Sequence, residues 1–124
     1  MLHRFIKMEG AMNPTKAEKR YHDMLAEIVG CIACRIDGFA NHYGSIHHVD
    51  GRTKPGCHMK VLFLCAPHHQ TGGKEAPSVH PWVRRFEQKY GTQESLILKC
   101  QEILKMKGLL NENFRKVTED KIIT

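Results

Sequence analysis

The chain has 124 residues, a length that fits one domain with a small core. Its 19 lysines and arginines outnumber its 13 aspartates and glutamates, and the net charge of +6 favours a polyanionic partner, most commonly nucleic acid, over a charge excess that only aids solubility. No segment approaches the roughly 20 apolar residues of a membrane span, and residues 1–12 lack the features of a signal peptide, so we expect no membrane partner and a cytosolic protein with reduced thiols.

Residues 1–13 are predicted to be a basic, flexible leader, and the first helix is predicted in "NPTKAEKRYHDMLAEIVG". Asn13 or Thr15 can cap the start of this helix, and Gly30 can end it. Apolar side chains recur along it at helical spacing, so one face is expected to pack in the core.

The middle of the chain is predicted to form two strands and a short helix. "CIAC" follows the first helix and leads into a polar, glycine-containing loop, "RIDGFANHYG". "SIHHV" has the length of a short strand, "DGRTKPG" contains the Gly and Pro of a loop, and "MKVLFLC" is an apolar run of strand length. "APHHQTGGK" can form a short helix with Pro67 near its first turn.

The C-terminal part is predicted to be helical. "HPWVRRFEQKYG" has Pro81 at a first-turn position, and Thr92 can cap "QESLILKCQEILKMKG". Three aromatic side chains spaced four residues apart are expected in the core: Trp82, Phe86 and Tyr90. Cys100 lies on the apolar stripe of the last helix and is expected to be a buried free thiol.

Four residues have the spacing of a metal site. Cys31 and Cys34 are separated by two residues, and Cys65 and His68 repeat that spacing with histidine last. Two such turns facing each other give a tetrahedral site of three thiolates and one imidazole, which suits Zn²⁺. The alternatives are a redox CxxC, which lacks the expected βαβ context, and cysteines that merely lie in a core. We predict a structural zinc that joins the first helix to the strand–helix unit.

Three further histidines can serve a second metal ion. If His68 binds zinc, His69 is left over, and His47 and His48 lie on the predicted strand before it. Neighbouring residues of a strand point to opposite faces, so one of that pair can join His69 on an ion while the other faces away. An ion with few protein ligands is an open, catalytic arrangement, and a neutral histidine beside it can take a proton from water.

These motifs resemble known nucleases. The histidine doublet, the apolar run ending in "LC" and the final Cys-x-x-His-His resemble HNH endonucleases of the ββα-metal, or His-Me finger, class over about residues 31–74. "GCIAC", "IHHVDGRTKPG", "LCAPHHQTGG" and "HPWVRRFEQKYG" are similar to the phage recombination enhancement function (Ref) family over about residues 16–91. Members of that family are described as RecA-dependent, HNH-type DNA nucleases.

The resemblance implies an α+β fold: a small zinc-stapled ββα-metal (HNH, His-Me finger) core with flanking α-helices. The nuclease domain would span residues 14–108, with the zinc and ββα core at about 31–74, C-terminal helices at about 81–107 and a tail at 109–124. Carried over to this chain, His48 is the general base, and His47 and His69 bind a catalytic Mg²⁺ or Mn²⁺.

The sequence departs from the family pattern at the usual middle Asn, near which it has His58 and Lys60. His58 is our candidate for the residue that orients His48, and a second structural zinc site of His58 with His42 is the alternative, so His58 is also a possible metal ligand. His80, before Pro81, can be a capping residue, a third metal ligand or a substrate contact, and the structural interpretation is preferred.

The implied function is metal-dependent cleavage of DNA in recombination, with 5′-phosphate and 3′-hydroxyl products. The expected partners are DNA and, by resemblance, the RecA filament in the cytoplasm of a bacterial host cell, with no small-molecule cofactor. Six basic residues are candidates for phosphate contacts: Arg52, Lys54, Lys60, Lys74, Arg84 and Arg85. The alternative is a non-catalytic, zinc-stapled module that binds DNA or acts as a recombinase adaptor.

Overall fold

The computed structural model describes residues 12–72 and 77–110. The predictions for residues 1–11 of the leader, for Lys74 and for residues 111–124 of the tail lie outside these ranges. Within them, no helix is both long enough and apolar enough to cross a membrane.

The first helix forms where it is predicted. Helix α2 (Lys16–Met24) begins after Thr15, whose hydroxyl oxygen accepts from the N–H of Glu18, and it continues into a π-helical segment, η1 (Leu25–Val29). Gly30 ends the helix with φ +71°, and a Cβ there would lie 2.6 Å from the carbonyl oxygen of Asn41. Only glycine therefore allows the chain to turn so close to the loop before the first strand.

A short helix, α3 (Ile32–Ile36), takes the place of part of the predicted loop. Cys31 caps it, because its sulfur accepts from the N–H of Cys34 at 3.5 Å. Ile32 and Ala33 are fully buried. A helix of five residues is too short to show an apolar period, which is why the sequence pattern did not reveal it.

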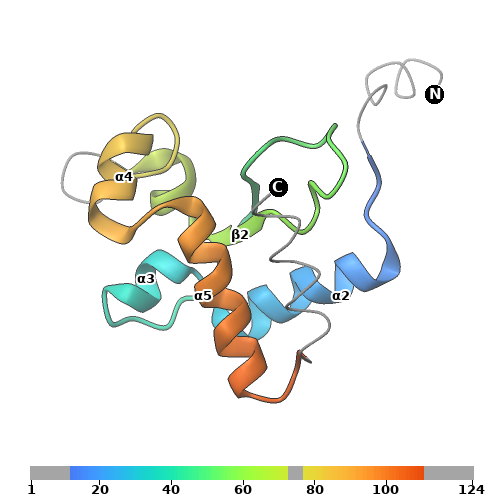
Figure 1. The fold of residues 1–124 in the computed structure, drawn as a ribbon. Helices are drawn as coiled ribbons and strands as arrows, with labels where there is room; N and C mark the ends of the chain where they lie inside the picture. Colours follow the sequence, from blue (N-terminus) through green and yellow to red (C-terminus); the bar gives the residue numbers. More distant parts are fainter. Residues whose placement is uncertain (1–11, 73–76, 111–124) are drawn as a thin grey trace.

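The two predicted strands form an antiparallel sheet of β1 (Ser45–His48) and β2 (Val61–Leu64). His47 lies opposite Leu62, and His48 lies opposite Val61. All four residues of β2 are buried, since β2 lies against α5, α3 and η1 (Figure 1).

The remaining elements are η2 (Pro67–Thr71), a short π-helical segment, then α4 (Val83–Tyr90) and α5 (Gln93–Met106). Helix α4 begins two residues after Pro81, not at it. The residues before it run instead along η2, with the N–H of Val79 donating to the carbonyl of His68 and that of His80 to the carbonyl of His69. The His80–Pro81 peptide bond is cis.

The core consists of apolar side chains from η1, α3, β2, α4 and α5. Phe86, Tyr90 and Cys100 are buried as predicted, but the prediction for Trp82 was wrong. Trp82 is 36% exposed because it precedes α4 and stacks with Arg85, whose guanidinium carbon lies 5.0 Å from the ring centroid. The mixture of helices with a small two-stranded sheet confirms the predicted α+β class.

Candidate active site and metal centre

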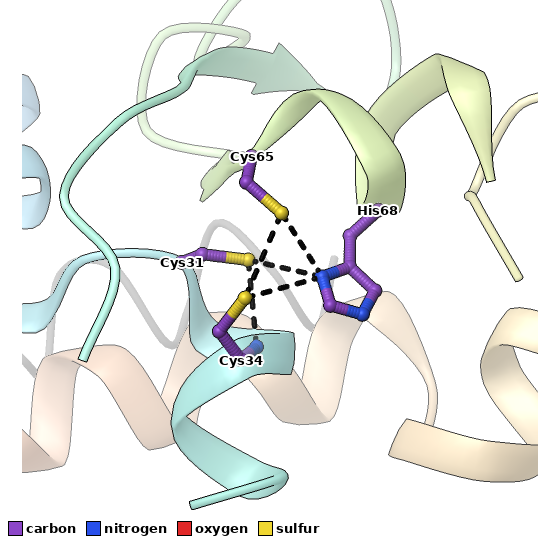
Figure 2. A group of neighbouring side chains, drawn as sticks. All are labelled: Cys31, Cys34, Cys65 and His68. Carbon is purple, nitrogen blue, oxygen red and sulfur yellow. Dashed lines mark hydrogen bonds between the residues drawn. The ribbon is translucent and has the colours of Figure 1, made fainter. Parts of the chain in front are cut away.

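Three cysteines and one histidine meet between two separate turns of the chain. Cys31 and Cys34 come from the start of α3, Cys65 follows β2, and His68 lies in η2; all four side chains point to one centre (Figure 2). The Nδ1 atom of His68 lies 3.5 Å from the sulfurs of Cys31 and Cys34 and 3.1 Å from that of Cys65. The sulfurs of Cys34 and Cys65 are 3.6 Å apart.

Three of these four separations match the edges of a tetrahedron around zinc, and the 3.1 Å between His68 and Cys65 is shorter than such an edge. With a Zn–S bond of about 2.3 Å and a Zn–N bond of about 2.0 Å, ligand atoms would lie roughly 3.5 to 3.8 Å from one another. All four ligand atoms lie within 4.8 Å of one another, and each residue is buried. The Cys3His cluster can therefore hold a structural metal such as zinc, as the spacing in the sequence predicted.

Burial makes this cluster depend on a cation. It raises the pKa of Cys31 to about 12, and it also raises the pKa of Cys34, so thiolates at these positions need a positive charge nearby. The pKa of His68 is lowered, mainly by burial, which keeps the imidazole neutral and its Nδ1 lone pair free for a metal ion.

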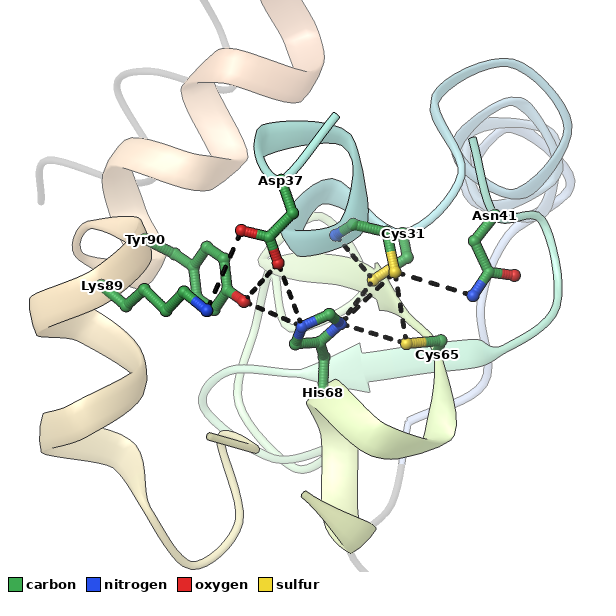
Figure 3. Close-up of polar contacts among 8 residues, drawn as sticks. Cys31, Asp37, Asn41, Cys65, His68, Lys89 and Tyr90 are labelled. Atoms are coloured by element: carbon green, nitrogen blue, oxygen red, sulfur yellow. Dashed lines mark hydrogen bonds and ion pairs between the residues drawn. The ribbon is translucent and has the colours of Figure 1, made fainter. Parts of the chain in front are cut away.

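Hydrogen bonds around the cluster orient its ligands (Figure 3). The Nε2 of His68 donates to the hydroxyl oxygen of Tyr90 at 2.9 Å, and that hydroxyl donates to a carboxylate oxygen of Asp37 at 2.7 Å. On the other side, the amide nitrogen of Asn41 donates to the sulfur of Cys34 at 3.6 Å. No sequence pattern predicts these three contacts, because Tyr90, Asp37 and Asn41 belong to no metal-ligand spacing.

A second group consists of three histidines. His47 on β1, His69 in η2 and His80 before α4 each provide a ring nitrogen, and these three atoms lie within 4.8 Å of one another. His47 is buried, His69 is half-buried and His80 is exposed. His80 therefore lies beside His47 and His69, the two metal ligands that the resemblance implies. The sequence alone favours a structural role for His80 over this position. The hydrogen bond from its N–H to His69 brings it there.

The members of the three-histidine group have partners outside it. The Nε2 of His47 lies 2.7 Å from the side-chain oxygen of Gln93 at the start of α5, and the Nδ1 of His69 lies 3.2 Å from the hydroxyl of Ser45. Since an amide oxygen accepts, His47 carries its proton on Nε2 and keeps a lone pair on Nδ1. The pKa values of His47 and His69 are lowered, first by burial, so both rings favour the neutral form that binds metal.

His48 has different neighbours from His47, as alternation along a strand predicts. Its Nε2 lies 3.0 Å from the Nδ1 of His58, which is 5% exposed. The pKa of His48 is lowered to about 4, first by burial and next by the positive charge of Arg52. The ring is therefore neutral at pH 7 and can accept a proton.

The second zinc site considered for His58 and His42 does not form. His42 is exposed and its Nδ1 donates to the carbonyl of Ala26 at 2.7 Å, whereas His58 has both ring nitrogens in other hydrogen bonds. Within residues 12–72 and 77–110, the groups able to bind a metal are the Cys3His cluster and the three histidines, and His58 belongs to neither.

The basic candidates for phosphate binding differ in their surroundings. Arg52 and Lys54 are exposed in the loop between the strands, and Arg84 and Arg85 are exposed on α4. Lys60 lies 3.0 Å from a carboxylate oxygen of Asp50, so its charge is partly balanced within the protein.

Residues 14–105 match a protein-family model described as "Recombination enhancement, RecA-dependent nuclease". The matched stretch contains the whole Cys3His cluster, the three-histidine group, and both His48 and His58.

Proposed function

The chain belongs to the family of recombination-enhancement, RecA-dependent nucleases, and we propose from this premise that it is an HNH-type endonuclease that hydrolyses DNA phosphodiesters. The observation that carries the proposal is the position of His48. This imidazole, kept neutral mainly by burial, lies one residue along the strand from His47, a member of the three-histidine group.

In the proposed reaction, His48 accepts a proton from a water molecule near the scissile phosphate. The water oxygen attacks phosphorus in line with the departing 3′ oxygen of the sugar. The bond from phosphorus to the 3′ oxygen breaks, that oxygen takes a proton from solvent, and the products carry a 5′-phosphate and a 3′-hydroxyl. A neutral imidazole suits this step because it is ready to accept the proton over the whole range from about pH 5 upward, given a pKa of about 4.

The ion that we propose for His47, His69 and His80 is a divalent ion that lies later in the first transition series than Mn²⁺. Imidazole nitrogens suit Zn²⁺, Fe²⁺ or Ni²⁺, whereas Mg²⁺ and Mn²⁺ prefer carboxylate and water oxygens. The donor set thus favours a different ion from the Mg²⁺ or Mn²⁺ that the sequence resemblance implied. When bound, such an ion would withdraw charge from the phosphate oxygens.

The DNA backbone is proposed to lie across the loop between β1 and β2 and the start of α4. Arg52 supports this placement, because its charge is close enough to His48 to lower the pKa of that ring. Arg84 and Arg85 are exposed and can contact phosphates farther along, with Arg85 stacked on Trp82. Lys54 and Lys60 remain candidates, with Lys60 the weaker one because of Asp50.

The nuclease domain is proposed to span residues 14–108, and the RecA filament is proposed to direct it to its substrate. Both the Cys3His cluster and the three-histidine group lie within this range, since their residues extend from Cys31 to His80.

The test is a cleavage assay with zinc-loaded protein on supercoiled and single-stranded DNA, with and without RecA–ATP filaments and across a series of divalent ions. His48→Ala is expected to lower kcat by about a hundredfold or more, the usual contribution of a general base. His42→Ala is the matched control, because this exposed histidine belongs to neither metal group. Equal cleavage by His48→Ala would exclude His48 as the base. If the wild type never cleaves either DNA substrate, with or without RecA filaments, the nuclease proposal is excluded and a DNA-binding or adaptor module is favoured instead.

A further inference from the structure

Beside the proposed base lies a histidine whose two ring nitrogens are both hydrogen-bonded. The Nδ1 of His58 lies 3.0 Å from the Nε2 of His48, and the Nε2 of His58 lies 2.5 Å from the backbone carbonyl oxygen of Met12. The rings of His48 and His58 meet edge to face, with their centroids 5.0 Å apart. Met12 precedes α2, so a backbone group from the first described residue reaches the surroundings of the proposed base.

The direction of these hydrogen bonds follows from the carbonyl group at their end. A carbonyl oxygen can only accept, so the Nε2 of His58 carries the proton that it donates to Met12. A neutral His58 then has its lone pair on Nδ1, which accepts from the Nε2–H of His48. His48 is thereby held with its proton on Nε2, and Nδ1 is the atom left to take a proton from water.

The backbone around His58 is held from several segments. The N–H of Met12 donates to the carbonyl oxygen of Arg52 at 2.8 Å, so both peptide groups of Met12 bind the loop between β1 and β2. In α2, the Nε2 of His22 donates to the carbonyl oxygen of His58 at 2.7 Å. His58 is also 5% exposed, so water does not readily replace these partners.

We propose that His58 is a positioning residue for His48 and that the carbonyl group of Met12 sets the tautomers of both rings, so that the segment before α2 completes the catalytic site. The inference rests on the role of His48 proposed above. The other tautomer of His58 would place a nitrogen lone pair against the carbonyl oxygen of Met12. In that tautomer, His58 would donate from its Nδ1 to the Nε2 of His48. The proton of His48 would then lie on the Nδ1 of His48, and that atom could not take a proton from water.

Two variants of His58 separate its two hydrogen bonds. Asn places its side-chain oxygen at the position of Nδ1 and keeps the acceptor for His48, whereas Gln reaches the position of Nε2 and keeps only the contact with Met12. We expect His58→Asn to cleave DNA with a kcat close to that of the wild type. We expect His58→Gln to lower kcat by about a hundredfold with little change in KM, because the base loses its tautomer and orientation.

Two variants of Met12 test the segment before α2. Met12→Pro removes the N–H that donates to Arg52, whereas Met12→Ala keeps both peptide groups and changes only a side chain that is 43% exposed. Met12→Pro is expected to lower kcat about tenfold, a loss of about 1.4 kcal/mol in transition-state stabilisation. Met12→Ala is expected to match the wild type. Zinc content and the thermal unfolding curve establish that each variant is folded.

A spectroscopic measurement reports the hydrogen bond without any cleavage. In DNA-free protein labelled with ¹⁵N-histidine, a ¹⁵N–¹⁵N scalar coupling is expected between His48 and His58 in the wild type and in Met12→Ala, and a weaker one in Met12→Pro. Absence of the coupling in the wild type overturns the inference, as does equal cleavage by His58→Asn and His58→Gln. If the wild type shows the coupling but never cleaves DNA, the hydrogen bond between His48 and His58 is present and the proposed nuclease function is wrong.

Discussion

The two ring nitrogens of His68 have different tasks. Nδ1 faces three cysteine sulfurs, and Nε2 donates a hydrogen bond to the hydroxyl oxygen of Tyr90. That hydroxyl in turn donates to a carboxylate oxygen of Asp37. A metal ion on Nδ1 withdraws charge from the ring, and a carboxylate reached through Tyr90 compensates for that loss. Asn41 acts in the complementary sense, because its N–H donates to a sulfur that carries negative charge when it binds zinc.

Tyr90→Phe is expected to weaken zinc binding without unfolding the protein. The ring still fills its place against Phe86, but the Nε2–H of His68 loses its acceptor. We expect the zinc dissociation constant to rise about tenfold, as is usual when such a partner of a metal ligand is removed. Competition with a chromophoric chelator measures this constant. Tyr43→Phe, at a site that is 89% exposed, is the control, and equal constants for both variants would show that the hydroxyl contributes nothing.

Cys100 is expected to resist alkylation in the folded protein. Burial raises its pKa to about 12, so at pH 8 far less of it is the reactive thiolate than in a free cysteine with a pKa of about 8.5. Mass spectrometry after iodoacetamide treatment at pH 8 should find Cys100 modified at least about a hundredfold more slowly than an exposed cysteine placed by Tyr43→Cys. Comparable rates would mean that the packing around Cys100 opens readily.

At the scale of elements, strand β1 separates the two kinds of histidine. His47 meets His69 and His80, while His48 meets His58, and the pairing with β2 fixes this register. A slip by one residue would exchange the two side chains, and the burial of all four residues of β2 disfavours such a slip.

Helix α5 contributes to the three-histidine group through Gln93 at its start. The side-chain oxygen of Gln93 accepts from His47, and the backbone N–H of Gln93 donates to a carboxylate oxygen of Glu87 in the last turn of α4. Gln93→Ala should therefore raise the metal concentration needed for half-maximal cleavage about tenfold, with the same rate at saturation. Gln88→Ala, at an exposed position of α4, is the matched control. A lower rate at saturating metal would instead indicate that Gln93 acts in the chemical step.

Local signals made most elements and the four residues of the Cys3His cluster predictable. Thr15 and Thr92 cap α2 and α5 as expected, Gly30 ends the first helix, and two matched ligand spacings identified the Cys3His cluster. The rest depends on contacts between distant segments. His80 joins His47 through the backbone pairing of its segment with η2, and the contact of His58 with Met12 arises only once α2 has packed against the loop. No residue spacing along the chain records such contacts.

At the scale of the whole molecule, the Cys3His cluster connects the N-terminal helices with the strand–helix unit. Cys31 and Cys34 follow η1, whereas Cys65 and His68 follow β2, and both segments pack against α5 (Figure 1). The core that they enclose is small, and a domain of this size has a low free energy of unfolding. Binding of a structural zinc ion, worth about 10 to 16 kcal/mol in small zinc domains, is comparable to the whole stability of such a fold.

Removal of zinc is therefore expected to unfold the protein cooperatively. Far-ultraviolet circular dichroism, recorded while a strong chelator is titrated in and bound zinc is counted, should show loss of most helical signal as the last zinc ion of each chain is removed. Cys34→Ala should give the same unfolded spectrum without chelator, whereas Cys57→Ala removes a buried thiol outside the cluster and should stay folded. His80→Ala should also keep the spectrum, because its exposed ring belongs to the other group. A full helical spectrum at zero zinc would mean that the contacts of β2 with α5, α3 and η1 hold the fold alone.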